Sequence, residues 1–175
     1  MLTDMEIIEQ HQALEGHFIQ PFSIESLSPC SYDLALGTKA IIDVPQGFGT
    51  VEQIQIDLTP YSEEHPFHLL PNAFILTEVQ EVLSLPSNIA GTVSLRSTYA
   101  RMGLNHSLAG HVDPGYYGRL TLELKNIKLY KAIPLWPGLK VCQIVFTRLD
   151  RPAYQDYSTP NHHYYGDMEV KGAKL

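Results

Sequence analysis

The side chains that could carry out chemistry are concentrated in the segment 91–126. Near its start, RSTYAR (96–101) places a serine and a threonine at an expected helix start between two arginines. Free backbone N–H groups and the dipole of a helix start favour an anion, and arginine binds phosphate through paired hydrogen bonds. The segment is therefore either a phosphate cradle or a simply capped helix with two solvated arginines. The four residues concerned are Arg96, Ser97, Thr98 and Arg101.

Two carboxylates follow this segment. Glu123 lies in GRLTLELKN (118–126), where polar and apolar residues alternate. The alternation predicts one apolar face, formed by Leu120, Leu122 and Leu124. Glu123 is then either a solvated sheet residue or a carboxylate aimed into a cleft. Asp113, in an Asp-Pro-Gly turn, could cap that turn or accept a hydrogen bond from a ligand hydroxyl.

Other catalytic and metal patterns are missing from the sequence. Neither histidine pair, at 65 and 68 or at 162 and 163, has a recognisable third ligand, so no metal held by protein side chains is expected. The zinc-deaminase pattern of HxE followed by PCxxC does not occur, because Cys30 has no partner cysteine. Ser97, His111 and Asp113 could be combined into a triad on paper, but no GxSxG elbow accompanies them.

Composition limits the classes of protein that remain. The chain has 175 residues, 44% hydrophobic and 18% charged, which indicates one globular domain. Cys30 and Cys142 lie far apart without a CxxC pair, which favours a reducing, intracellular location. A net charge of −7 argues against a nucleic-acid groove, and no window approaches the roughly 18 apolar residues of a membrane span. We expect a cytoplasmic protein without nucleic-acid or membrane partners.

The elements that position these residues are mostly short strands. Pro and Gly recur between alternating or apolar runs, which predicts antiparallel strands in a sandwich or barrel. The clearest runs are TKAIIDV (38–44), AFILTEVQEVLSL (73–85), GRLTLELKN (118–126) and KVCQIVFTRL (140–149).

Two helices and a tail complete the expected organisation. The first helix begins at a cap on Thr3 or Asp4 and ends near Gly16. The second is short and lies in RSTYARMGL (96–104), with the serine or threonine as its cap. Residues 152–175 are polar and aromatic without a period, so we expect a C-terminal arm or lid on the single domain 1–175.

The motifs taken together resemble those of the dCTP deaminase branch of the dUTPase-like superfamily. The matching segments are CSYDLALG (30–37), FHLLPNAFILTEVQEVLSLP (67–86), LRSTYARMGL (95–104), AGHVDPGYYGRLTLEL (109–124) and LWPGLKVCQIVF (135–146). They cover most of residues 18–149 in the family's order. The resemblance implies a mainly β, dUTPase-like barrel or jelly-roll-like fold. It also implies homotrimers or hexamers, active sites at subunit interfaces and no zinc.

The resemblance also implies roles for particular residues. Glu123 matches the family's catalytic glutamate, Ser97 assists it, and Asp113 matches the residue that holds the deoxyribose 3′-hydroxyl. Gln143 and Tyr157 match positions that contact or close over the triphosphate. The remaining nucleotide and phosphate contacts would be Arg96, Thr98 and Arg101.

The segment AGHVD (109–113) bears on the outcome of the reaction. Members of the family that only deaminate tend to carry Ala-His-Arg-Ile-Asp, whereas members that also cleave dUTP tend to carry Ala-Gly-aromatic-Ile-Asp. Ala109, Gly110 and His111 are therefore expected substrate contacts, and the glycine favours the bifunctional group. His111 is a planar ring in place of the usual Trp or Phe.

The implied reaction is deamination of dCTP to dUTP, followed by cleavage to dUMP and pyrophosphate, in the supply of dUMP and dTTP precursors. A partly buried Glu123 could shuttle protons, and the Ser97 hydroxyl with carbonyls near Leu108 and Ala109 could orient the water. Mg²⁺ would be held mainly by the triphosphate, and dTTP is a candidate inhibitor.

Two alternatives remain open on the same fold: a dUTP diphosphatase without deamination, and an idle nucleotide-sensing or protein-binding module. The tail favours only the idle module, because it departs from the closing pattern of the family. Its HYYGD sequence places Asp167 near the expected phosphates, so Lys171 or Lys174 would have to compensate the negative charge.

Overall fold

The computed structural model describes residues 1–106, 109–159 and 162–174. Its elements are α1 (Asp4–Ala13), β1 (Ile19–Gln20), the 3₁₀ turn η1 (Ile24–Ser26), β2 (Leu27–Ser28), β3 (Ser31–Gly47), β4 (Thr50–Asp57), β5 (Phe67–Leu69), β6 (Phe74–Ser84), β7 (Ile89–Leu95), α2 (Ser97–Met102), β8 (Leu104–His106), β9 (His111–Val112), β10 (Tyr117–Asn126), β11 (Ile133–Leu135) and β12 (Lys140–Arg148). The prediction of a mainly β fold with an N-terminal helix and one short internal helix is confirmed.

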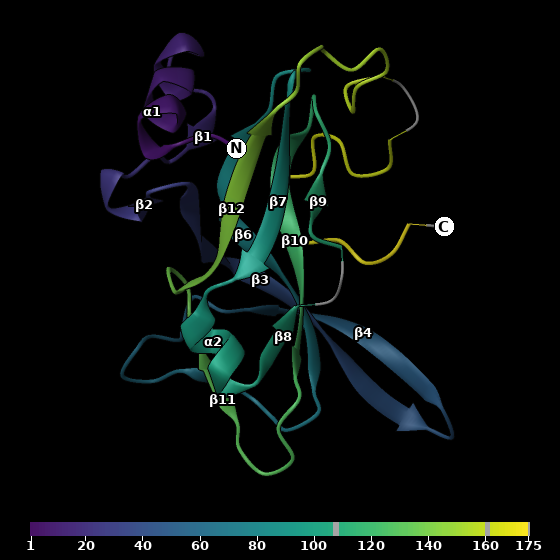
Figure 1. Ribbon diagram of the computed structural model, residues 1–175. Helices are drawn as coiled ribbons and strands as arrows, with labels where there is room; N and C mark the ends of the chain where they lie inside the picture. The colour runs from purple at the N-terminus through teal and green to yellow at the C-terminus, as the bar shows by residue number, and fades with distance from the viewer. Residues whose placement is uncertain (107–108, 160–161, 175) are drawn as a thin grey trace.

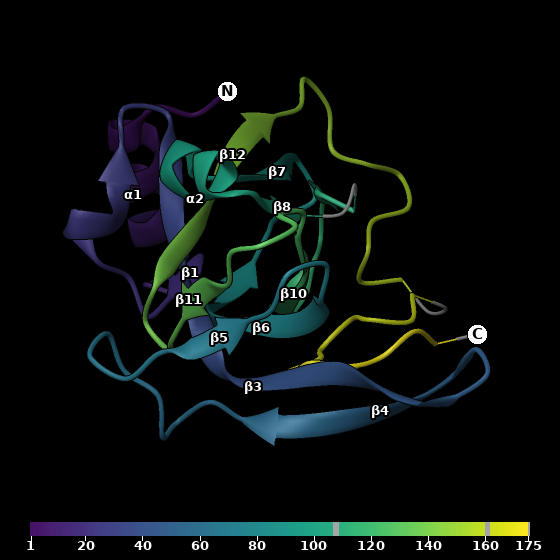
Figure 2. The ribbon, with the colours of Figure 1, turned by 90° about the horizontal axis from the view of Figure 1, so that it is seen from below.

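The strands of the main sheet follow the order β8-β10-β6-β3-β12-β7-β9, and every pairing is antiparallel. The sheet curls into a half-barrel (Figures 1 and 2). Beside this path, the two-residue strands β1 and β2 pair with β6 and β3, and the eight-residue β4 pairs with β3. Strands β5 and β11 pair in a separate ribbon. The core fills the concave side, with Leu34, Ile75, Leu124, Ile144 and Phe146 fully buried.

Helix α1 begins as the sequence predicts. Thr3 and Glu6 form a capping box, in which each side chain accepts from the backbone of the other. Ile7 is fully buried, and Gly16 follows the helix with φ +84°, a value that glycine adopts without strain. In the described part of the chain, no helix is long and apolar enough to cross a membrane.

Strand β3 crosses from one part of the sheet to another. Its first half pairs with β12 and its second half with β6 and β4, and the register with β6 shifts between Leu36 and Ala40. Two buried glutamates on β6 accept hydrogen bonds from backbone N–H groups within this shift and just before it. Glu78 Oε1 accepts from the N–H groups of Thr38 and Lys39, both at 3.3 Å.

The second glutamate, Glu81, is 5% exposed and accepts from Ala35 N at 3.1 and 3.3 Å. Burial raises the pKa of the Glu81 carboxyl from 4.5 to about 7. Because the folded chain holds this proton more tightly than the unfolded chain, the stabilisation is complete below about pH 4.5 and is lost as the pH rises through about 7.

Glu81→Gln is therefore expected to reduce the loss of stability between about pH 5 and 8, by up to about 3 kcal/mol. The glutamine oxygen can still accept from Ala35 N but does not ionise. Urea unfolding of parent and variant at both pH values measures the difference. An equal loss in both proteins would contradict the assignment.

Candidate functional site

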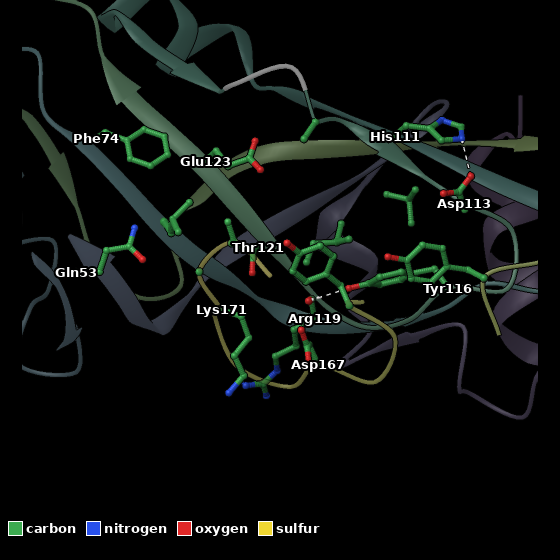
Figure 3. A pocket seen from close by; sticks show the side chains of 18 residues that line it. Gln53, Phe74, His111, Asp113, Tyr116, Arg119, Thr121, Glu123, Asp167 and Lys171 are labelled. Atoms are coloured by element: carbon green, nitrogen blue, oxygen red, sulfur yellow. Dashed lines mark hydrogen bonds and ion pairs between the residues drawn. The ribbon is translucent and has the colours of Figure 1, made fainter. Parts of the chain in front are cut away.

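A cavity of about 510 Å³ opens between β10, the loops around β9 and the C-terminal arm (Figure 3). The sheet and its hairpin supply Gln53, Phe74, Leu76, Leu120, Thr121 and Glu123. The β9 region and the start of β10 supply Ala109, His111, Val112, Asp113, Tyr116 and Arg119. The arm supplies Tyr157, Tyr164, Asp167, Lys171, Gly172 and Ala173.

Glu123 stands in the middle of β10, opposite Leu76 on β6, and its side chain lines the cavity. It is half-buried. Burial raises the pKa of its carboxyl above the ordinary value, and the charge of nearby His106 opposes that rise. A carboxyl whose pKa is raised towards the working pH is better suited to accept and donate a proton than a fully solvated one.

The predicted alternation along β10 fails at Leu120. The register with β6 shifts between Arg119 and Thr121, so a β-bulge turns Leu120 into the cavity, next to Thr121 and Glu123. Leu122 and Leu124 occupy the buried face as expected. The bulge places more of β10 on the cavity wall than strict alternation would allow.

The β9 region forms an adjoining wall. His111 Nε2 lies 3.2 Å from Asp113 Oδ1, and both side chains are more than half exposed towards the cavity (Figure 3). The Gly110 carbonyl accepts from Val93 N at 2.7 Å, and a Cβ on Gly110 would lie 2.7 Å from Val93 O. Only glycine fits here, because any side chain would strike the neighbouring backbone.

The structure separates the predicted site residues into two groups. The cavity brings together Ala109, His111, Asp113, Glu123 and Tyr157, with Gly110 directly behind its wall. It leaves five predicted residues outside: Arg96, Ser97, Thr98, Arg101 and Gln143. Helix α2 and the C-terminal arm lie on opposite sides of the molecule in both views (Figures 1 and 2). Leu108 lies outside the described residues.

Helix α2 begins one residue earlier than predicted. Arg96 is the N-cap and makes no side-chain cap bond, so the prediction that Ser97 or Thr98 caps the helix is wrong. The cause is the preceding strand, because Arg96 N donates to Val141 O at 2.9 Å and keeps the Arg96 backbone extended. Thr98 and Arg101 are exposed.

Arg96 and Gln143 have partners within the chain. Arg96 Nη1 lies 3.3 Å from Asp33 Oδ2, and Ser31 Oγ donates to Gln143 Oε1 at 3.0 Å. Burial raises the pKa of Asp33, and Arg96 opposes that rise. Arg96 is the N-cap of α2, so its ion pair lies at the start of that helix, and none of these side chains lines the cavity that contains Glu123.

The arm closes the cavity with aromatic side chains. Tyr157 packs against Tyr116 at 5.5 Å between ring centroids and stacks on His162 at 4.3 Å. Of the two lysines expected to compensate Asp167, Lys174 makes the ion pair, with Nζ 2.7 Å from Oδ2. Lys171 instead lines the cavity. The cavity wall therefore keeps the positive charge of Lys171, because Lys174 balances the charge of Asp167.

Sequence reasoning missed several cavity residues. Thr121 could have been found, because the same alternation puts it beside Glu123. Gln53 gave no signal, since it reaches the site from the distant β3–β4 hairpin. Within the described ranges, no group of three His, Cys, Asp or Glu side chains could hold a metal ion.

Comparison with solved structures identifies a known fold. A solved structure of 2′-deoxycytidine 5′-triphosphate deaminase from Agrobacterium tumefaciens aligns with a TM-score of 0.64 at 22% identity. The alignment covers 83% of this chain and 46% of that one, so the chain spans about half the length of that relative. The half-barrel is thus a fold that this chain shares with that solved structure.

The family follows from sequence. A family model described as dCTP deaminase-like matches residues 1–149. A protein of Tropheryma whipplei (strain Twist) named "dCTP deaminase, dUMP-forming" is 36% identical over 172 residues, covering 91% of this chain and 84% of that protein. One of the same name from Nanoarchaeum equitans (strain Kin4-M) is 35% identical over 196 residues, covering 100% and 97%. The chain belongs to the dCTP deaminase-like family, and the resemblance in its motifs is confirmed.

Proposed function

We propose that this protein deaminates dCTP to dUTP and ammonia, then hydrolyses dUTP to dUMP and pyrophosphate, in the cytoplasmic supply of thymidylate precursors. The observation that carries the proposal is Glu123, a half-buried carboxyl of raised pKa in a nucleotide-sized cavity. The names of relatives that align over almost the whole chain support both steps.

The first step needs one proton shuttle. Glu123 takes a proton from water as the water oxygen bonds to C4 of cytosine, and delivers that proton to the ring nitrogen. The C4–N bond then breaks, and the amine leaves as ammonia after gaining a second proton from the added hydroxyl. The water would be held by hydrogen bonds, one of which it would donate to the Ala109 carbonyl on the cavity wall.

The complete site would use two copies of the chain. Ser97 and Arg101 lie away from the cavity that contains Glu123, although the family pattern assigns them to the same nucleotide. A homotrimer, alone or paired into a hexamer, would bring α2 of the partner subunit to the open side of this cavity. Arg101 of the partner subunit would then bind phosphate oxygens, with Mg²⁺ carried by the triphosphate and no zinc.

Residues of the β9 region support the second step, the hydrolysis of dUTP. Asp113, which lines the cavity beside His111, would hold the 3′-hydroxyl. Tyr157 would cover the nucleotide from the arm. Water attack on the α-phosphate of dUTP releases pyrophosphate and requires no proton on the pyrimidine ring.

Incubation of the purified chain with dCTP and Mg²⁺ tests the proposal. We expect ammonia and dUMP in equal amounts, with little free dUTP. Ammonia with dUTP as the end product would remove the second step. Turnover of added dUTP without ammonia from dCTP would indicate a dUTP diphosphatase, and binding without turnover would indicate a sensing module.

A further inference from the structure

The C-terminal arm is hydrogen-bonded to the edge of β10. Gly166 N donates to Tyr117 O and Arg119 N donates to Asp167 O, both at 2.8 Å. Between these bonds, the arm lies directly over Gly118, where a Cβ would be 2.6 Å from Asp167 O. Two backbone hydrogen bonds thus hold the arm against β10, and Asp167 lines the cavity.

Beyond this contact the arm is anchored by a buried hydrogen bond. Val170 is 3% exposed, and its N–H donates to Glu78 Oε2 at 3.1 Å. Glu78 is itself 1% exposed, and its other oxygen accepts from Thr38 and Lys39 at the β3 crossover. One carboxylate therefore joins three backbone donors from two distant parts of the chain.

We propose that Glu78 is a positioning residue that latches the arm over the cavity before nucleotide binds. The latch is the pair Glu78 and Val170. Its consequence for nucleotide rests on the proposed function: Asp167, Lys171 and Ala173 stand in the cavity wall only while the arm is held. An arm ordered in advance spares the nucleotide the entropic cost of ordering it.

The chemistry of this position requires a carboxylate. An ionised carboxylate only accepts hydrogen bonds, whereas an amide accepts at one end and donates at the other. In Glu78→Gln, the amide oxygen would remain with the two donors of the crossover, Thr38 and Lys39. The amide NH₂ would then face Val170 N–H, donor against donor, and the arm would be released.

Two variants remove the hydrogen bond between Val170 N and Glu78 Oε2, one at its acceptor and one at its donor. Glu78→Gln removes the acceptor, and Val170→Pro removes the N–H while leaving Glu78 and the crossover unchanged. Glu169→Gln is the matched control, because Glu169 is exposed on the same segment and loses the same charge.

The first readout is hydrogen exchange without nucleotide. In both variants we expect segment 166–174 to exchange at least about tenfold faster than in the parent, as for loss of one charge-assisted hydrogen bond. Peptides of β6, peptides of β10 beyond Arg119 and the control should be unchanged, whereas Arg119 N loses its bond to Asp167 O when the arm is released. If Glu78→Gln fails to fold, the exchange rate of the arm in Val170→Pro decides whether the latch exists. Parent-like exchange of the arm in the folded variants would overturn the latch.

The second readout is steady-state turnover of dCTP. Since Glu123 stands on β10 and not on the arm, KM should rise about tenfold while kcat stays within about threefold. Faster arm exchange with an unchanged KM would overturn the positioning role. Should the parent not turn over dCTP, the proposed function fails, and the exchange result still decides the latch, with dCTP affinity by calorimetry replacing KM.

Discussion

Glu123→Gln is expected to lower the rate of dCTP deamination by at least about a hundredfold, the usual contribution of a general acid–base group. Glutamine keeps the size and a hydrogen-bonding capacity at this position, so the cavity should still bind dCTP. It cannot take a proton from water and pass it to the ring. Quenched time courses at saturating dCTP measure the effect.

Two comparisons make the Glu123→Gln result specific. Conversion of added dUTP to dUMP should fall much less, because that step delivers no proton to the pyrimidine. Glu9→Gln, with the same charge change at an exposed position of α1, should behave as the parent. Deamination by Glu123→Gln at near the parent rate would make Glu123 a solvated sheet residue.

Arg101→Ala is expected to weaken dCTP binding by about 2 kcal/mol, or roughly thirtyfold, through loss of a charge-assisted phosphate contact. Arg101 is exposed on the last turn of α2, so folding should be largely unaffected. Calorimetric titration of dCTP into parent and variant checks the affinity. An unchanged affinity would leave Arg101 as a surface residue.

The same variant tests whether two chains share each site. Co-expression of Glu123→Gln with Arg101→Ala should restore activity above the sum of the separate variants, since some mixed sites combine an intact Glu123 with the partner subunit's intact Arg101. No restoration in verified mixed trimers would contradict the shared site. A fully active monomer in sedimentation would contradict it as well.

Much of the fold could be predicted because its signals are local. Alternation and Pro or Gly punctuation located β6, β10 and β12, and capping chemistry located α1. The crossover of β3 could not be found in this way, since it depends on Glu78 and Glu81, which lie about 40 residues further along the chain. The bulge at Leu120 likewise depends on pairing with β6.

The candidate site likewise has one part that local sequence signals predict and one part that depends on tertiary contacts. Glu123, His111 and Asp113 lie near one another in sequence, and β9 and β10 bring them to one cavity. The arm was expected from composition, but its course over Gly118 and its bond to Glu78 arise from tertiary contact alone. The separation of α2 from the cavity could also not be read from sequence, because both motifs belong to one family pattern.

Turnover of dCTP in H₂¹⁸O, with mass analysis of the dUMP formed, tests both proposed reactions in one measurement. We expect two heavy oxygens in each dUMP, one at C4 of the uracil from attack on the base and one on the phosphate from attack at the α-phosphorus. Recovery of unlabelled dCTP bound to a folded protein, without ammonia or labelled uracil, would contradict this expectation.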